Sequence, residues 1–182
     1  MHEQVTISRD MEATAIPSGE PVRIPEGTGA TITQALGGSY TLITDMGWMV
    51  RVSGKEVEAI GKEVPKEVEI STDASKDELE PLVWDQMKTC FDPEIPVNIV
   101  DLGLVYLCEL NEVEGEETKY DVQVKMTLTA PGCGMGPVLA DDVRQKIESL
   151  APVRKANVEI VFDPMWDRSM MSEAAKLQLG MY

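Results

Sequence analysis

Residues 71–77, Ser-Thr-Asp-Ala-Ser-Lys-Asp, separate two stretches of chain whose hydrophobic residues repeat with different periods. Before them, short apolar runs lie between turn residues, and almost no helical repeat is visible. After them, runs with the period of an amphipathic helix alternate with runs with the period of a strand. Because a small, polar connection divides the two patterns, the sequence predicts two domains, residues 1–72 and residues 76–182.

The first stretch predicts a small, mostly-β domain. Residues 1–30 are rich in proline and glycine, which favours extended, loop-rich chain. Residues 40–52 read as two strands around the turn Asp45-Met46-Gly47, a hairpin signal. Further short strands are expected near residues 55–60 and 64–70. The resulting sheet is either closed or open, and it carries no catalytic constellation.

The second stretch begins with a predicted amphipathic helix and continues with two strands. Pro81 is not expected deep inside the helix, so the helix should start near residues 78–81 and end before Asp92. A strand is expected over residues 99–110. Residues 120–129 then alternate between apolar and polar side chains without a miss, which predicts a half-buried strand antiparallel to the first.

A second helix and a third strand complete the pattern. The helix should begin near Pro137, with Leu139, Val143, Ile147 and Leu150 as its buried stripe. The strand is expected from Ala156 to Phe162, and a short helix near residues 173–179. The order helix–strand–strand–helix–strand predicts an α+β fold, a two-layer domain with two helices on a small antiparallel sheet.

Composition narrows the possible functions. The formal net charge is −16, with 32 acidic and 16 basic residues, so the surface should repel nucleic acid. No stretch approaches the roughly 18 apolar residues that a membrane span needs, and the first residues lack a signal-peptide pattern. The single histidine, His2, lies at the terminus, which disfavours a Ser-His-Asp or Cys-His nucleophile. We therefore expect a cytoplasmic protein that is neither a hydrolase nor a protease.

The three cysteines divide into two kinds. Cys90 and Cys108 lie on apolar faces of predicted elements, so both should be buried structural residues. Cys133 lies in a glycine-rich loop before a helix, where backbone amides and the positive helix end favour a thiolate. Thiolates are the ligands of iron–sulfur clusters, but a cluster takes about four of them. A cluster or metal at Cys133 would therefore need a second subunit, as in a homodimer, a small-molecule thiol or a partner protein.

Two acidic positions are further candidates. Asp92-Pro93-Glu94 forms a rigid turn whose carboxylates either cap nearby backbone or line a site. Asp101 stands in an apolar run, where a carboxylate needs hydrogen bonds or a metal unless it points to the open face at the start of the strand.

Phosphate binding is a weak alternative function for the cysteine loop, because Gly132, Gly134 and Gly136 form G-x-G-x-G rather than the dinucleotide pattern G-x-G-x-x-G.

Three ordered motifs resemble the PaaD/SufT family of metal–sulfur cluster biosynthesis proteins. They are the segment from Asp92 to Tyr106, the loop Thr127-Leu128-Thr129-Ala130-Pro131-Gly132-Cys133 and the segment Phe162-Asp163-Pro164-Met165-Trp166. The resemblance covers about residues 76–182, and residues 37–42, 48–51 and 171–181 are similar to the longer SufT members. It implies two helices on a small antiparallel sheet and a role in maturing iron–sulfur proteins, with Cys133 as the cluster-facing or reactive residue.

The resemblance also extends the candidate site. It implies that Asp92, Glu94 and Asp101 line the same site as Cys133, with Thr129, Gly132 and Gly134 from its loop. The partners would be the iron–sulfur assembly machinery and client apoproteins, and the cofactor a transient iron–sulfur cluster. Two alternatives stay open: a noncatalytic PaaD-like subunit of an oxygenase-type complex, and a thiol-redox protein that uses Cys133 with a resolving cysteine.

Overall fold

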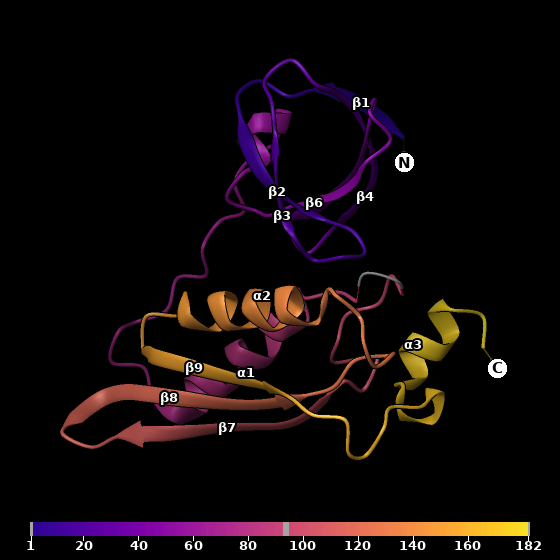
Figure 1. Ribbon diagram of the computed structural model, residues 1–182. Helices are drawn as coiled ribbons and strands as arrows, with labels where there is room; N and C mark the ends of the chain where they lie inside the picture. Colours follow the sequence, from indigo (N-terminus) through magenta and orange to yellow (C-terminus); the bar gives the residue numbers. More distant parts are fainter. Residues whose placement is uncertain (1, 93–94, 182) are drawn as a thin grey trace. The chain divides into compact units, whose positions relative to one another are not determined.

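The computed structural model describes residues 2–92 and 95–181, which form two compact units (Figure 1). One unit comprises the chain up to Lys66 together with Cys133–Met135. The other comprises Glu67–Gly132 and the chain from Gly136 onward. The described residues contain two sheets and three α-helices, so the predicted α+β class is confirmed. The first division along the chain falls between Lys66 and Glu67, several residues before the polar connection singled out in the sequence.

The first unit is a six-stranded antiparallel sheet with the strand order β1-β4-β5-β6-β2-β3. Figure 1 shows the sheet curving around its own interior. The core consists of side chains that alternate inward along the strands, such as Ile24, Ile32, Leu42 and Val50. Its elements are β1 (Glu3–Thr6), β2 (Met11–Ala15), β3 (Pro21–Ile24), β4 (Gly29–Leu36), β5 (Ser39–Thr44), β6 (Met49–Val52) and the 3-10 helix η1 (Val57–Ile60).

The predicted hairpin of the first unit is confirmed, and two of its predicted strands are wrong. Strands β5 and β6 pair across the Asp45-Met46-Gly47 turn, with Ile43 opposite Met49. The stretch expected as a strand near residues 55–60 contains the short helix η1, which buries Val57, Ala59 and Ile60. Residues 64–70 form no strand in the described chain, because Pro65 offers no backbone donor to a ladder.

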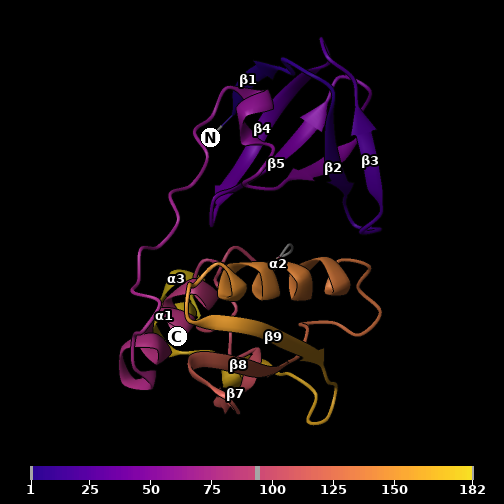
Figure 2. The ribbon, with the colours of Figure 1, turned by 90° about the vertical axis from the view of Figure 1, so that its left-hand side faces the viewer.

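The second unit contains a three-stranded sheet with the order β7-β8-β9. Tyr120, Val122, Val124 and Met126 of β8 are buried, as their alternation predicted. Helix α2 lies along β9, and α1 lies beside α2 (Figures 1 and 2). The elements of the second unit are α1 (Lys76–Met87), β7 (Val105–Val113), β8 (Glu116–Met126), α2 (Gly136–Glu148), β9 (Val153–Ile160), the 3-10 helix η2 (Arg168–Met170) and α3 (Glu173–Gln178).

The sheet of the second unit is mixed rather than antiparallel throughout. Strands β7 and β8 are antiparallel, but β9 runs parallel to β8, with Val124 opposite Val158. The expectation of an antiparallel sheet is therefore wrong for the last pair. The reason is the connection: α2 carries the chain back along the sheet, so β9 starts where β8 starts. Strand β9 also spans Val153–Ile160 rather than residues 156–162, and Phe162 is exposed.

Helix α1 starts earlier than its proline suggested. It begins at Lys76, because Ser75 accepts a hydrogen bond from the Glu78 amide while the Glu78 carboxylate accepts one from the Ser75 amide. This capping box satisfies donors that the first helical turn otherwise leaves unpaired. Pro81 lies inside the helix, where it donates no backbone hydrogen bond, so the predicted start at residues 78–81 is wrong.

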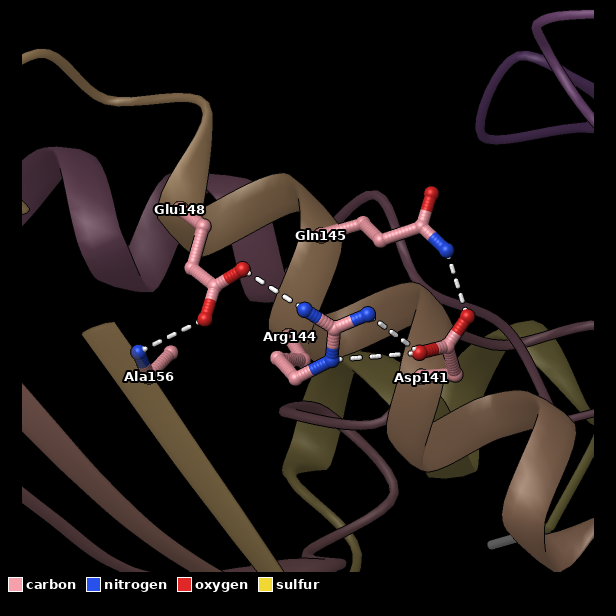
Figure 3. Close-up of polar contacts among 5 residues, drawn as sticks. All are labelled: Asp141, Arg144, Gln145, Glu148 and Ala156. Carbon is pink, nitrogen blue, oxygen red and sulfur yellow. Dashed lines mark hydrogen bonds and ion pairs between the residues drawn. The ribbon is translucent and has the colours of Figure 1, made fainter. Parts of the chain in front are cut away.

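Polar contacts along α2 join the helix to itself and to β9 (Figure 3). Arg144 bridges Asp141, at 2.6 Å, and Glu148, at 2.7 Å, one turn away on either side. The other carboxylate oxygen of Glu148 accepts a hydrogen bond of 3.1 Å from the backbone amide of Ala156 in β9. Exposed ion pairs contribute little, so of these contacts the one to Ala156 matters most for joining α2 to β9.

The capping box of α1 gives a first testable prediction. We expect Ser75→Ala to lower the free energy of unfolding by about 1 kcal/mol, because the Glu78 amide loses its acceptor. Denaturant unfolding followed by circular dichroism measures the change. Ser149→Ala is the control, since this serine is exposed and its hydroxyl donates to the carbonyl of Lys146 at the end of α2. Equal losses in both variants would contradict a specific role for the capping box.

Candidate functional site

Three connections of the second unit meet at one end of its sheet. There β7 begins while β8 and β9 both end, because β8 is antiparallel to β7 and parallel to β9. The Thr127 amide donates to the carbonyl of Leu104 at 2.8 Å, and the Val161 amide donates to the carbonyl of Met126 at 2.8 Å. These two hydrogen bonds hold together the chain that enters β7, the chain that leaves β8 and the chain that leaves β9.

Asp92 joins two of these connections. Its side chain is only 5% exposed, so its carboxylate needs donors to offset the loss of water. The Ile95 amide donates to Oδ1 at 3.0 Å, and the Thr129 hydroxyl donates to Oδ2 at 3.2 Å. The capping interpretation of Asp92 is therefore confirmed, and the same carboxylate also contacts Thr129. Glu94, the other carboxylate predicted for this turn, lies outside the described residues.

Asp101 lies in a turn and not in a strand. The predicted strand over residues 99–110 begins only at Val105, because the Asn98 side chain accepts hydrogen bonds from the amides of Val100 and Asp101 and bends the chain. The Asp101 carboxylate accepts a hydrogen bond of 2.7 Å from the Asn98 amide group and one of 3.1 Å from the Ser172 hydroxyl. Hydrogen bonds therefore offset the desolvation of Asp101, one of the three possibilities that the sequence left open.

The three cysteines have different environments. Cys133 is half-buried in the connection between β8 and α2, one residue after Gly132, whose positive φ of 81° turns the chain. Cys90 is fully buried, as expected. Cys108 is only half-buried, so its predicted burial is incomplete. Burial, with smaller contributions from Glu80 and Glu109, raises the pKa of the Cys108 thiol to about 11.

The structure adds residues that the sequence analysis did not assign to the site. Asn98 and Ser172 hold Asp101, and Thr127 lies beside Leu128 with its side chain fully buried. Among the described residues, the Thr127 hydroxyl has no hydrogen-bond partner. The spacing Asn98-x-x-Asp101 is typical of a side-chain-capped turn and was the available signal in the sequence. Nothing local in the sequence pointed to Ser172.

The described residues contain neither a cluster of metal-binding side chains nor a helix that could cross a membrane. Within residues 2–92 and 95–181, no three His, Cys, Asp or Glu side chains gather closely enough to hold a metal ion. Gly134 lies in the same connection as Cys133, and a Cβ atom at this position would lie 2.4 Å from the carbonyl oxygen of Ser18. In the described part of the chain, no helix has the length and apolar character to cross a membrane.

The raised pKa of Cys108 predicts selective alkylation. At pH 8 a thiol with a pKa of about 11 holds about 100-fold less thiolate than one at the ordinary value of 9.0. We therefore expect iodoacetamide to modify Cys133 first, Cys108 slowly and Cys90 last in the folded protein. Peptide mass spectrometry over time measures the three rates, and unfolding in urea should make them alike. Modification of Cys108 as fast as a free thiol would contradict this environment.

Two neighbouring threonines predict opposite effects of the same change. Thr129→Val removes a donor from the buried carboxylate of Asp92 and should lower the free energy of unfolding by about 1 kcal/mol. Thr127→Val removes a buried hydroxyl without a partner among the described residues, so it should leave the stability unchanged or raise it. Denaturant unfolding compares the two variants. An equal loss in both would show that the Thr127 hydroxyl makes a stabilising contact.

Known proteins that are similar to this chain agree with the three motifs seen in its sequence. The sequence profile of a family described as "Iron-sulfur cluster assembly protein" matches residues 82–160. A protein of Porphyromonas gingivalis named "Fe-S protein maturation auxiliary factor" is 44% identical over 94 residues, 52% of this chain and 84% of that one. The protein of Staphylococcus aureus named "Fe-S protein maturation auxiliary factor SufT" is 42% identical over 89 residues, 49% of this chain and 94% of that one.

Further relatives include the protein of Bacillus subtilis named "Fe-S protein maturation auxiliary factor YitW". It is 40% identical over 89 residues, 49% of this chain and 81% of that one. A solved structure of a domain of unknown function, DUF59, from Bacillus anthracis is 31% identical and covers 58% of this chain and 95% of that one, with a TM-score of 0.47. The resemblance seen in the three motifs is confirmed by the relatives, and the chain belongs to the family of iron–sulfur cluster assembly proteins.

Proposed function

We propose that this protein is an accessory factor in the assembly of iron–sulfur clusters or their delivery to client apoproteins, and that it acts through Cys133. The relatives named as auxiliary factors of Fe–S protein maturation support the general role, since they align over the second unit at 40–44% identity. The proposed partners are the assembly machinery and the clients. The cluster is then transient cargo rather than a permanent redox centre, and the protein is not an enzyme.

The contrast among the three cysteines carries the proposal for Cys133. Cys90 is buried, and the thiol of Cys108 stays protonated at neutral pH because burial raises its pKa to about 11. Cys133 is half-buried in a connection whose preceding Gly132 adds no side chain to obstruct an approaching group. Of the three thiols, Cys133 is therefore the one best suited to meet a cluster or a partner's thiol.

One cysteine sets the stoichiometry of the proposed contact. A cluster takes about four thiolates, so a cluster at Cys133 takes its other ligands from a second copy of the chain, a small thiol or a client. Shared ligation makes the cluster easy to pass on, because the recipient's cysteines replace the temporary ligands one at a time. The three cysteines form no disulfide among the described residues, and the location we propose is the cytoplasm, a reducing compartment.

Residues around the loop complete the proposed site. Asp92 and Thr129 fix the start of the loop, and Gly132, where a Cβ atom would meet nothing within 4 Å, is proposed to leave room for the cargo. Gly134 stays a candidate from the sequence, since a Cβ atom there would meet the backbone of Pro17 and Ser18. Asp101 contributes indirectly, because both of its carboxylate oxygens accept hydrogen bonds from Asn98 and Ser172. Glu94 stays a candidate from the sequence. The work of cluster assembly is assigned to residues 76–182, the range that the motifs cover.

Anaerobic reconstitution with iron and sulfide tests the role of Cys133. We expect the wild-type protein to bind iron and sulfide in an oligomer or with added glutathione, and Cys133→Ser to lose most of the cluster absorbance. Cys108→Ser is the matched control and should retain it. Bound iron, sulfide and native mass are measured together. A cluster that persists in Cys133→Ser would overturn the assignment of Cys133 as a ligand.

A reversible disulfide would favour the alternative thiol-redox function. Titration with oxidised glutathione, followed by mass spectrometry of the unreduced protein, distinguishes it from the carrier. A carrier forms at most a mixed disulfide at Cys133, whereas a thiol-redox protein forms an intrachain bond to Cys90 or Cys108. The high pKa of Cys108 disfavours the second outcome, because a protonated thiol resolves a mixed disulfide slowly.

A further inference from the structure

The C-terminal segment, residues 163–180, supplies hydrogen-bond donors to a stretch of chain that belongs to neither sheet. That stretch is the site turn, residues 95–104, which connects the end of α1 to β7. The Ser172 amide donates to the carbonyl of Asp101 at 2.8 Å, and the Trp166 indole donates to the carbonyl of Leu102 at 2.6 Å. The Gln178 side chain donates to the carbonyl of Pro96 at 3.3 Å. Carbonyls that a sheet would otherwise pair are therefore paired by the C-terminal segment.

Side chains also join the two segments. The hydroxyl of Ser172 donates to the Asp101 carboxylate, and the hydroxyl of Tyr106 donates to the carbonyl of Pro164 at 2.8 Å. Met171 and Ala175 of the C-terminal segment are buried, at 5% and 1% exposure. Figure 1 shows this segment, in yellow, at the end of the sheet where the connection after β8 also begins. The segment is thus a packed part of the second unit, although it lies beyond residues 82–160 that the family profile matches.

Gly103 makes the close approach possible. Its φ of 76° is a conformation that other residues rarely adopt. A Cβ atom at this position would lie 2.2 Å from the carbonyl oxygen of Met170, far inside van der Waals contact. Any side chain at position 103 would therefore push the C-terminal segment away from the site turn.

Hydrogen bonds join the site turn to the chain around Asp92. Ile99, Leu102 and Leu104 are fully buried and anchor its inner side. The amide of Ile99 donates to the carbonyl of Cys90 at 2.9 Å, and Phe91 and Asn98 pair as an isolated antiparallel bridge. A displacement of the site turn would therefore be felt at Asp92, whose carboxylate holds the Ile95 amide and the Thr129 hydroxyl.

From these contacts we propose that the C-terminal segment positions the candidate site, and that Gly103 is the positioning residue on which its docking depends. The docked segment fixes the site turn from outside, and the site turn in turn fixes Asp92 against Thr129. This inference rests on the proposed function only in treating Asp92 and Thr129 as part of a functional site. The positions of Asp92, Thr129 and the site turn are measurable without a cluster.

Gly103→Ala in the full chain tests the proposal, with Gly115→Ala as the matched control. Gly115 also has a positive φ, of 83°, but a Cβ there meets nothing within 4 Å. Both variants carry the same backbone strain, and only Gly103→Ala collides with the C-terminal segment. We expect hydrogen exchange of the Ser172 and Ile95 amides to become at least about tenfold faster in Gly103→Ala and to stay near the wild-type rate in Gly115→Ala.

A double-mutant cycle with Thr129→Val separates positioning from general destabilisation. If Gly103→Ala already loosens the contact between Asp92 and Thr129, Thr129→Val should shift the denaturant midpoint less in that background than in the wild type. In the Gly115→Ala background the shift should be the wild-type one. Additive shifts, together with unchanged exchange at Ile95, would overturn the proposal, because the segment would then stabilise the fold without positioning Asp92.

A milder variant keeps the test available if Gly103→Ala does not fold. Trp166→Phe removes only the indole donor to the carbonyl of Leu102 and preserves an aromatic ring. We expect faster exchange at Ile95 and a reduced effect of Thr129→Val, and the wild-type values of both would contradict the proposal. The reconstitution of Cys133→Ser is independent: a failure there overturns the function of the thiol and leaves the positioning of Asp92 to be judged on exchange and coupling alone.

Discussion

The candidate site depends on a buried carboxylate that two short connections share. Asp92 is withdrawn from water, and a carboxylate in that position is tolerated only when donors surround it. The donors come from its own turn, through the Ile95 amide, and from the connection after β8, through the Thr129 hydroxyl. The desolvation of one side chain thus links two parts of the chain that no ladder joins, and the loop with Cys133 starts from this link.

Much of the second unit follows from local sequence, and the remainder from contacts that are distant in sequence. The alternation of residues 120–126 and the stripe of α2 predicted the right elements, because each buries one face against the other. The site turn was mistaken for a strand, since Ile99, Leu102 and Leu104 are apolar and all buried. The Asn98 side chain ends the strand pattern there by accepting hydrogen bonds from the amides of Val100 and Asp101. Hydrophobic periodicity gives no sign of such a contact.

The candidate site divides in the same way. Turn chemistry and family motifs predicted Asp92, Thr129 and Cys133 as site residues, and their role stays a prediction. The contact between Asp92 and Thr129 needed the structure, because it joins residues 37 positions apart. The direction of β9 also needed the structure, since the alternation of side chains does not show whether a strand runs parallel or antiparallel to its neighbour. Ser172 was missed because the sequence around it indicates only a helix cap and gives no sign of a contact with the distant Asp101.

The hydrogen bond between Ser172 and Asp101 closes a loop of chain between residues 71 positions apart. Closing a loop of that length costs chain entropy, which favours forming the contact only after β7, β8 and β9 have assembled. The site turn would then gain its outer partners late in folding, after the cysteine loop has already been placed between β8 and α2. A chain arrested before that step would carry the Cys133 thiol without the hydrogen bonds that join Ser172 to Asp101.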